Sequence, residues 1–481
     1  MIEFRPIIFI IGILLTVLAV AMVIPAIVDI AVGHPDWQVF MVAACVTLFV
    51  GVSMMLTTRA SLRRFSVRQA FVMTNLAWLV IVIFGALPFQ FSELELSAVD
   101  AFFEAMSGVT TTGATVIVGL DFAPPGILLW RAILQWLGGI GIIVMAVAVL
   151  PMLQVGGMQM FRIEAFDADK VLPRAAQIAG GISIVYVLLT GVGALVLWSV
   201  GMSGFDAVAH AMTSIATGGF STYDASVGHF DNAAIDWAMS VIMVLGSVPF
   251  VLYLRVVRGD LRTVFGDTQI RWFLSILAVS IVLVALWLYY GDVMGPLDSL
   301  RYSTFNVISV MTGSGFATAD YGRWGNFVVA IMFVLMFIGG CAGSTTCGIK
   351  IFRIQVLYAT AEAQIHRLMQ PNGVFFPYYN RKPISESVAS SVMSFFFLFV
   401  TCFALLAVAL GLTGLDFITA LSGAASAIAN VGPGLGDVIG PAGNYATLPD
   451  SAKLLLSLGM LLGRLELLTV LILLAPAFWR G

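Results

Sequence analysis

The sequence predicts an all-α polytopic membrane protein. It contains four parallel membrane–pore–membrane repeats around one central pore, preceded by an N-terminal two-helix hairpin. Three observations predict this class. The chain is 60% hydrophobic and only 10% charged, whereas about 25% of the residues of soluble domains are charged. Apolar stretches of about 20 residues, long enough to span a bilayer, recur along the whole length. Short Gly/Ser/Thr runs lie between such stretches at four places.

The spanning segments come first in the order of the chain. The apolar stretches fall at residues 7–30, 38–57, 69–90, 126–150, 177–200, 235–257, 271–290, 325–360, 388–411 and 453–478. We expect the first to be a retained helix, because Arg5 precedes it and no small-residue cleavage pattern follows it. The first two form the hairpin and the other eight pair into repeats. The expected units are 1–64, 65–174, 175–268, 269–383 and 384–481.

A shorter apolar segment lies between the two spans of each repeat. These segments begin near Asp100, Asp206, Asp298 and Asp416, and an acid at a helix N-terminus is favoured by the helix dipole. Helices of about 10–16 residues cover about 15–24 Å, which is too short to cross about 30 Å of hydrocarbon. We therefore expect four re-entrant pore helices.

Each expected pore helix is followed by a run of small residues. The runs are Val109, Thr110, Thr111, Thr112, Gly113; Ile215, Ala216, Thr217, Gly218, Gly219; Met311, Thr312, Gly313, Ser314, Gly315; and Asn430, Val431, Gly432, Pro433, Gly434. Irregular backbone at membrane depth must be buried in protein or line water. Glycine permits positive φ and adds no side chain, so successive carbonyls can face one axis and replace the water shell of a cation. A single run could reflect close helix packing, but four equivalent runs favour a selectivity filter.

The distribution of basic residues predicts the orientation. With the N-terminus inside, most Lys and Arg residues fall on the inner side, and only Arg301, Arg323 and Lys453 fall on the outer side. This is the positive-inside pattern. Each repeat crosses twice, so all four repeats share one orientation and are related by an axis along the membrane normal. Acids gather on the outer side, at Glu93, Glu95, Asp121, Asp224, Asp231, Asp320 and Asp437, where they raise the local cation concentration.

The eighth span is interrupted. Phe327–Ile338 is apolar for only 12 residues, and Gly339–Gly348 then holds four glycines among small polar residues. We interpret this segment as flexible backbone beneath the filter that blocks or opens the pore. The alternative is a simple loop between a core helix and a cytoplasmic amphipathic helix. For Cys341 and Cys347 we expect a packing role.

An arginine lies in the middle of the last span. Arg464 there costs at least about 2.5–3.5 kcal/mol, so it should face protein or water; a snorkelling surface arginine is the alternative. Glu466 is two residues further on, hence on another face of the helix, and is not the expected partner.

The four runs and the segment Gly339-Gly340-Cys341-Ala342-Gly343-Ser344-Thr345-Thr346-Cys347-Gly348-Ile349-Lys350 resemble the TrkH/KtrB/HKT superfamily of potassium and sodium transporters, and within it the TrkH branch. The resemblance covers the whole length. It implies that the glycine ending each filter strand is matched by Gly113, Gly219, Gly315 and Gly434. Sodium-preferring members often carry serine at the first of these, so Gly113 points to potassium. The implied potassium ligands are Thr111, Thr112, Thr217, Gly218, Thr312, Gly313, Ser314, Val431 and Gly432.

The same resemblance implies a gate, partners and a location. The gating residues would be Gly339, Gly340, Gly343, Ser344, Thr345, Thr346, Gly348 and Lys350, with Arg464 held against them. The chain would work as a homodimer in the lipid of the bacterial inner (cytoplasmic) membrane, N-terminus cytoplasmic, on a cytosolic TrkA-like nucleotide-binding subunit. Basic inner loops could receive that subunit, although positive-inside bias alone explains them. Potassium would be the transported ion, with no organic cofactor and no nucleic acid.

The sequence leaves other functions open. A sodium-permeable or ion-coupled cation transporter of the same superfamily is one alternative. A polytopic membrane enzyme is another, but no Ser/His pair or HExxH motif is present in the sequence. Glu104 and His210 hold matching places in the first two pore helices, where we expect a place on the pore-helix surface or a hydrogen bond between segments rather than ion ligation. We expect Arg131 to neutralise nearby acids at the outer edge.

Overall fold

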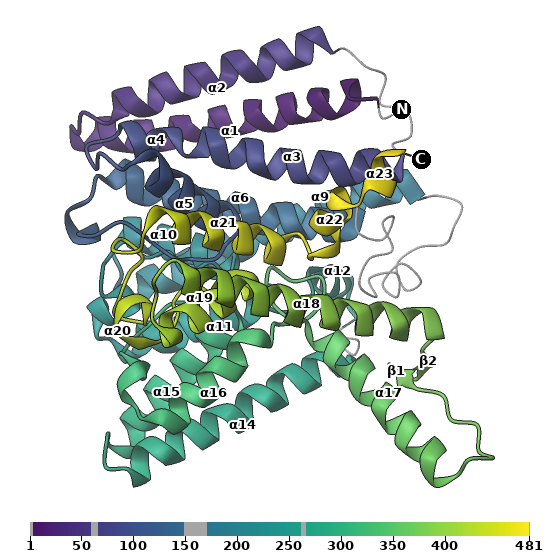
Figure 1. Cartoon of the computed structure of the whole chain (residues 1–481). Coiled ribbons are helices and arrows are strands. Elements are labelled where there is room, and N and C mark those ends of the chain that lie inside the picture. Colours follow the sequence, from purple (N-terminus) through teal and green to yellow (C-terminus); the bar gives the residue numbers. More distant parts are fainter. Residues whose placement is uncertain (1–2, 59–65, 149–170, 261–265, 481) are drawn as a thin grey trace.

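The computed structural model describes residues 3–58, 66–148, 171–260 and 266–480. Long helices run side by side along one direction, and both termini lie at the same end of the bundle (Figure 1). Several basic residues assigned to the inner side lie outside the described residues, namely Arg59, Arg63, Arg64, Arg162, Lys170 and Arg262.

The N-terminal hairpin consists of α1 (Arg5–Val32) and α2 (Trp37–Thr57). The left-handed Gly33 ends α1 with φ of 81°. Gly12 and Gly51 face each other across the pair, and a Cβ on Gly12 would lie 2.7 Å from the Gly51 carbonyl oxygen. Small residues therefore let the two backbones approach closely, as in many membrane helix pairs.

The four repeats have corresponding elements in chain order. The first spans are α3 (Val67–Gly85), α9 (Val171–Ser199), α14 (Thr268–Tyr290) and α18 (Glu386–Leu412). The pore helices are α5 (Ala98–Val109), α10 (Gly204–Ile215), α15 (Pro296–Met311) and α19 (Phe417–Ala429). The second spans are α6 (Pro125–Ala148), α11 and α12 (Ala233–Gly246, Phe250–Val257), α16 and α17 (Asn326–Phe337, Ile351–Met369), and α21 and α22 (Asp450–Arg464, Leu468–Leu471).

Short elements complete the described chain. They are α4 (Leu87–Phe91), α20 (Gly436–Ile439), α23 (Pro476–Arg480) and the 3-10 turns η1 (Leu120–Phe122), η2 (Ser226–Phe230), η3 (Tyr321–Arg323) and η4 (Ile472–Leu474). The strands β1 (Tyr378–Tyr379) and β2 (Lys382–Pro383) pair antiparallel, with Tyr378 opposite Pro383. They lie beyond α17, which extends away from the bundle (Figure 1).

The second span is broken in three repeats, where the sequence predicted one break. α11 and α12 meet at 93°, and α21 meets the following Leu468–Leu474 segment at 106°. The prediction of continuous sixth and tenth spans was therefore wrong. Pro249 explains the first break, because the residue before a proline is disfavoured in the α conformation. At the second break Glu466 and Leu467 have φ of 62° and 42°, outside the right-handed helix region.

The fold class is confirmed. Within the described ranges seven helices are long and apolar enough to cross a membrane, and two further bent pairs meet the same test. The interrupted eighth span adds the 12-residue apolar α16. The four pore helices are only 12, 12, 16 and 13 residues long, as their re-entrant geometry requires.

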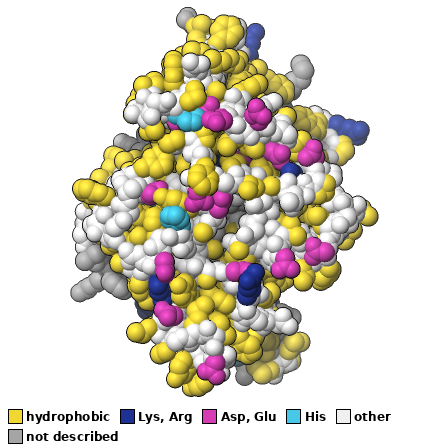
Figure 2. Space-filling model, turned by 90° about the vertical axis from the view of Figure 1, so that its left-hand side faces the viewer, with side chains coloured by type: hydrophobic (Ala, Val, Ile, Leu, Met, Phe, Trp, Pro, Cys, Tyr) yellow, Lys and Arg dark blue, Asp and Glu magenta, His cyan; other side chains and the backbone are white. Residues whose placement is uncertain are grey.

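One end of the bundle is acidic. The face on the left of Figure 1, seen head-on in Figure 2, carries many more Asp and Glu than Lys and Arg side chains. Asp121, Asp224, Asp231 and Asp437 are all exposed. Such a surface attracts cations to its clefts.

Candidate selectivity filter and gate

Side-chain caps start three of the pore helices and fix the point where each begins. Ser97 and Ser203 accept hydrogen bonds from the backbone N–H of Asp100 and Asp206, and Asp416 accepts one from Thr419. Proline at the first position starts the remaining pore helix, α15. Each pore helix leads directly into its filter run, so the negative ends of four helix dipoles approach the four strands.

The filter strands share an unusual backbone geometry. Thr111, Thr217 and Asn430 have φ of 51–53°, and Gly313 at the corresponding place has φ of 70°. Left-handed conformation in a β-branched threonine is a genuine outlier. Strain of this kind is characteristic of functional sites, where the surrounding structure maintains it. Two buried oxygens at this level, Thr111 Oγ1 and Asn430 Oδ1, have no hydrogen-bond partner among the described residues.

Two residues further on, four glycines form a closed ring. A Cβ on Gly113 would lie 2.2 Å from the Gly218 carbonyl oxygen, and a Cβ on Gly219 would lie 1.7 Å from that of Ser314. A Cβ on Gly315 would lie 2.1 Å from the Val431 oxygen. The ring closes at the fourth glycine, Gly432, where a Cβ would lie 2.7 Å from the Thr112 oxygen. Each glycine therefore faces the carbonyl that precedes the glycine of the next repeat.

The fourth member of this ring differs from the sequence match. The sequence aligned Gly434 with Gly113, Gly219 and Gly315, but Gly432 has the positive φ, 107°, and the contact across repeats. Gly434 instead packs against the side chain of Ile439. Because Asn430 takes the left-handed place of Thr111, the fourth strand reaches the ring position two residues earlier than the alignment of run ends suggests.

Pore-helix hydroxyl groups bond a carbonyl at or just after the candidate filter run in two repeats. Ser309 of α15 donates to the Phe316 carbonyl at 2.6 Å, and Ser426 of α19 donates to that of Gly432 at 2.7 Å. Tyr445 also donates to the Gly432 oxygen, at 2.7 Å. In α10 the corresponding Thr213 hydroxyl donates to the Ala209 carbonyl of its own helix. It therefore does not bond a carbonyl of the second strand.

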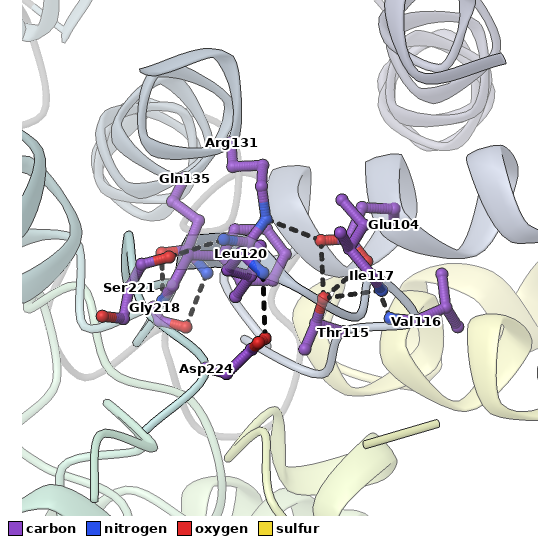
Figure 3. Close-up of polar contacts among 11 residues, drawn as sticks. Glu104, Thr115, Val116, Ile117, Leu120, Arg131, Gln135, Gly218, Ser221 and Asp224 are labelled. Atoms are coloured by element: carbon purple, nitrogen blue, oxygen red, sulfur yellow. Dashed lines mark hydrogen bonds and ion pairs between the residues drawn. The ribbon is translucent and has the colours of Figure 1, made fainter. Parts of the chain in front are cut away.

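A buried arginine pairs with an acid of repeat 1 and bonds a carbonyl of repeat 2. Arg131 Nε donates to Glu104 Oε1 at 2.8 Å and Arg131 Nη1 donates to the Ser221 carbonyl at 2.6 Å, with both side chains at most 1% exposed. Glu104 also accepts from Thr115 Oγ1 and the Val116 N–H. Figure 3 shows these groups converging between the two strands. Arg131 is thus a buried crosslink rather than a group at the outer edge, whereas Glu104 hydrogen-bonds between segments as expected.

His210 lies in the matching place of α10. One ring nitrogen bonds the Asp206 carbonyl at 2.9 Å, and the other bonds Ser221 Oγ at 3.0 Å. The residue is fully buried and its ring stacks near Phe316. Both ring nitrogens are therefore occupied by hydrogen bonds inside the protein.

Segment 339–348 folds back on itself beneath the filter. Ile338 and Ile349 pair as a parallel bridge at its base. The broken sixth span supplies its docking surface, because Cys341 N–H donates to the Ser247 carbonyl and Phe250 N–H donates to that of Gly343. The Thr345 hydroxyl lies 3.0 Å from the Ile215 carbonyl oxygen and 2.9 Å from that of Gly246, and the two acceptors share its single proton.

Arg464 lies against this segment. Its Nη1 donates to the Thr345 carbonyl at 3.0 Å and to Cys347 Sγ at 2.8 Å, and its Nη2 donates to the Gly138 carbonyl at 2.9 Å. The side chain is 1% exposed. Cys347 is therefore a hydrogen-bond acceptor as well as a packing residue.

A second buried cation beside the segment was missed from the sequence. Arg353 pairs with Glu466, and its guanidinium lies 3.7 Å from the centre of the Phe395 ring. Lys350 is also buried, so three cations and one carboxylate gather around the segment. The polar pair Arg464 and Glu466 within one apolar span was the available signal, since an unpaired intramembrane acid requires a partner.

These features define a class of protein: a multi-pass membrane protein in which four re-entrant segments meet at a glycine ring, with a buried loop segment flanked by cationic side chains next to it. Residues 36–480 match TrkH, a family described as cation transport protein. The chain belongs to the TrkH family.

Relatives cover the full length. The chain is 45% identical to the Trk system potassium uptake protein TrkI of Halomonas elongata, over 99% of this chain and 97% of that one. It is 37% identical to TrkH of Escherichia coli K12, over 99% and 100%. The crystal structure of the potassium transporter TrkH from Vibrio parahaemolyticus superposes with a TM-score of 0.93 at 36% identity, and each chain is covered completely. Membership of a transport family leaves no support for the membrane-enzyme alternative.

Proposed function

We propose that this chain takes up potassium through a four-part filter of backbone carbonyls. The carbonyls of Thr112, Gly218, Ser314 and Val431 form one level of that filter. The observation that carries the proposal is the ring in which each of these oxygens faces a glycine of the neighbouring repeat. Carbonyl dipoles in such a ring replace the hydration shell of an alkali cation. The relatives named potassium uptake proteins support potassium as the ion.

We further propose that residues 65–174, 175–268, 269–383 and 384–481 are the four repeats, each giving one strand. Segment 339–348, with Lys350 and Arg464, forms the gate below the filter. Two features support this role: the guanidinium holds a loop carbonyl, and buried positive charge opposes the passage of a cation. Movement of the segment away from Ile215 and Gly246 would open the path.

The remaining assignments concern assembly and location. We propose a bacterial inner-membrane protein with the N-terminus in the cytoplasm, working as a homodimer with a cytosolic TrkA-like nucleotide-binding subunit. The word system in the relatives' names supports more than one component. The acidic face of Figure 2 would then receive external cations.

A paired substitution tests the filter. Rubidium uptake into liposomes containing only this chain is measured with competing potassium or sodium. We expect Gly432→Ser to lower the potassium-to-sodium preference, because its side chain enters the ring. Gly434→Ser is the matched control, and its preference should stay near wild type. Equal preference in Gly432→Ser, Gly434→Ser and wild type would refute the assignment of Gly432.

A further inference from the structure

The buried side-chain amide of Gln135 hydrogen-bonds the peptide groups on both sides of Gly219, a filter glycine of a different repeat. Gln135 is fully buried in the middle of α6, the second span of repeat 1. Its Nε2 donates to the Gly218 carbonyl at 2.6 Å, and its Oε1 accepts from the Phe220 N–H at 3.1 Å. The two bonds engage the peptide groups on either side of Gly219. Because the carbonyl only accepts and the N–H only donates, these partners also dictate the orientation of the amide.

Arg131, one turn before Gln135 on α6, adds a third point of attachment. It donates to the Ser221 carbonyl and lies 4.0 Å from the centre of the Phe220 ring. The backbone between Gly218 and Ser221 is therefore held at three atoms by one helix (Figure 3). The second strand therefore has a neighbour's helix bonded to its Gly218 and Ser221 carbonyls, in addition to the bonds that its own pore helix makes.

The same contact explains the extra glycine of the second strand. At the place of Gly218 the other strands carry Thr112, Ser314 and Val431, all with a Cβ. A Cβ on Gly218 would lie 2.4 Å from Gln135 Cδ and 2.5 Å from Oε1. Glycine is needed at this place because the amide occupies the space that a side chain would fill.

In three of the four second spans a methionine lies three residues before a glycine at the matching position; in the first, the place of that methionine is taken by Gln135. Three residues after it comes Gly138, and the same spacing gives Met243 with Gly246, Met336 with Gly339 and Met460 with Gly463. The three methionines are buried, at 0%, 1% and 1% exposed. One turn earlier the residue matching Arg131 is Met239, Met332 or Leu456. Only repeat 1 has polar groups at both places.

We propose that Gln135 is a positioning residue that sets the ion preference of the filter by fixing the Gly218 carbonyl. This proposal rests on the proposed filter function. A hydrogen bond from Nε2 holds the oxygen in place and draws on its electron density, and both the position and the field of carbonyl dipoles determine which cation is preferred. The four-part ring is consequently asymmetric, with one oxygen controlled from outside the strand.

The test uses Gln135→Met in the full chain. Methionine has a similar length, removes both hydrogen bonds and gives repeat 1 the residue found in the other three repeats. Met243→Leu is the matched control, a volume-conserving change at the equivalent place of repeat 2. Rubidium uptake in liposomes is measured with potassium or sodium as competitor and normalised to folded protein. We expect the potassium-to-sodium preference to fall about three- to tenfold in Gln135→Met, the range that follows from losing the one hydrogen bond to the Gly218 carbonyl, and to stay unchanged in Met243→Leu.

The results distinguish failure of the positioning role of Gln135 from failure of the filter proposal itself. An unchanged preference in folded Gln135→Met, with Gly219→Ser lowering it, would overturn the positioning role and leave the filter in place. An unchanged preference in both would also remove the filter. If Gln135→Met does not fold, Gln135→Glu takes its place. It keeps the acceptor for Phe220 and replaces the donor to Gly218 with a carboxylate oxygen. A lowered preference then supports the proposal and an unchanged one refutes it.

Discussion

Removal of the Arg464 side chain should open the pore. In Arg464→Ala the segment loses the donors to the Thr345 carbonyl and Cys347 Sγ, while the bond to the Gly138 carbonyl joins two other elements and does not bias the segment. A hydrogen bond from a charged group contributes about 1.5–3 kcal/mol. Counting only the bond to Thr345, the closed-to-open ratio falls by roughly 10- to 150-fold, since about 1.4 kcal/mol corresponds to a factor of ten. Loss of positive charge from the cation path acts in the same direction.

The assay is rubidium uptake per folded protein in liposomes, without any regulatory partner. Basal flux should rise at least several-fold in Arg464→Ala. Arg464→Lys keeps the charge but lacks the fork of donors, so it should fall between wild type and alanine. Arg480→Ala removes an exposed arginine near the end of the same chain and should leave flux unchanged. Flux at or below wild type in well-folded Arg464→Ala would refute the gating role and leave Arg464 as a packing residue.

Three further predictions follow from the same geometry. Gly113→Ser should retain a folded protein but lower potassium-to-sodium preference in competition flux, because its Cβ meets the Gly218 carbonyl oxygen; an unchanged preference at full expression would contradict the ring. Thr345→Val should raise basal rubidium flux, since it removes the hydroxyl donor that the Ile215 and Gly246 carbonyls share; unchanged flux would show that the hydroxyl does not hold the gate. Single cysteines at the exposed Asp121 and Asp437 should react with an impermeant thiol reagent from the periplasmic side, and labelling only from the cytoplasm would overturn the parallel arrangement.

The fold could be predicted from the sequence because membrane spans are encoded by composition. Hydropathy and the even number of crossings per repeat give four parallel units, and short segments beginning at acids give the pore helices. The capped starts at Asp100, Asp206 and Asp416 agree with this interpretation. Hydropathy and helix-start residues can be recognised from neighbouring positions in the sequence, so predicting them does not require knowing which distant residues come into contact.

Hydropathy alone could not predict the two additional breaks or the fourth ring glycine. An apolar stretch remains apolar when it bends, so the turn after Gly246 had only Pro249 as its signal. The register of the fourth strand depends on which residue adopts the left-handed conformation, and Asn430 does so where a threonine does so in two other repeats. The partners of Glu466 and Arg131 come from other segments of the chain, and a single sequence does not specify which distant groups meet.

In the gate proposed above, the docking of segment 339–348 would link closing of the pore to the break in the sixth span. Helix α10 ends at Ile215 and α11 ends at Gly246, and each end leaves carbonyls without a partner inside its helix. Thr345 bonds one carbonyl from each end, so in this position the segment satisfies groups that would be costly to bury unpaired. If the segment moved away as proposed, those carbonyls would need hydration instead. Water entering the opened pore would supply that hydration and would offset part of the free-energy cost of undocking. A continuous sixth span would keep the Gly246 carbonyl within its own helix and would remove one of the two contacts that favour the closed segment.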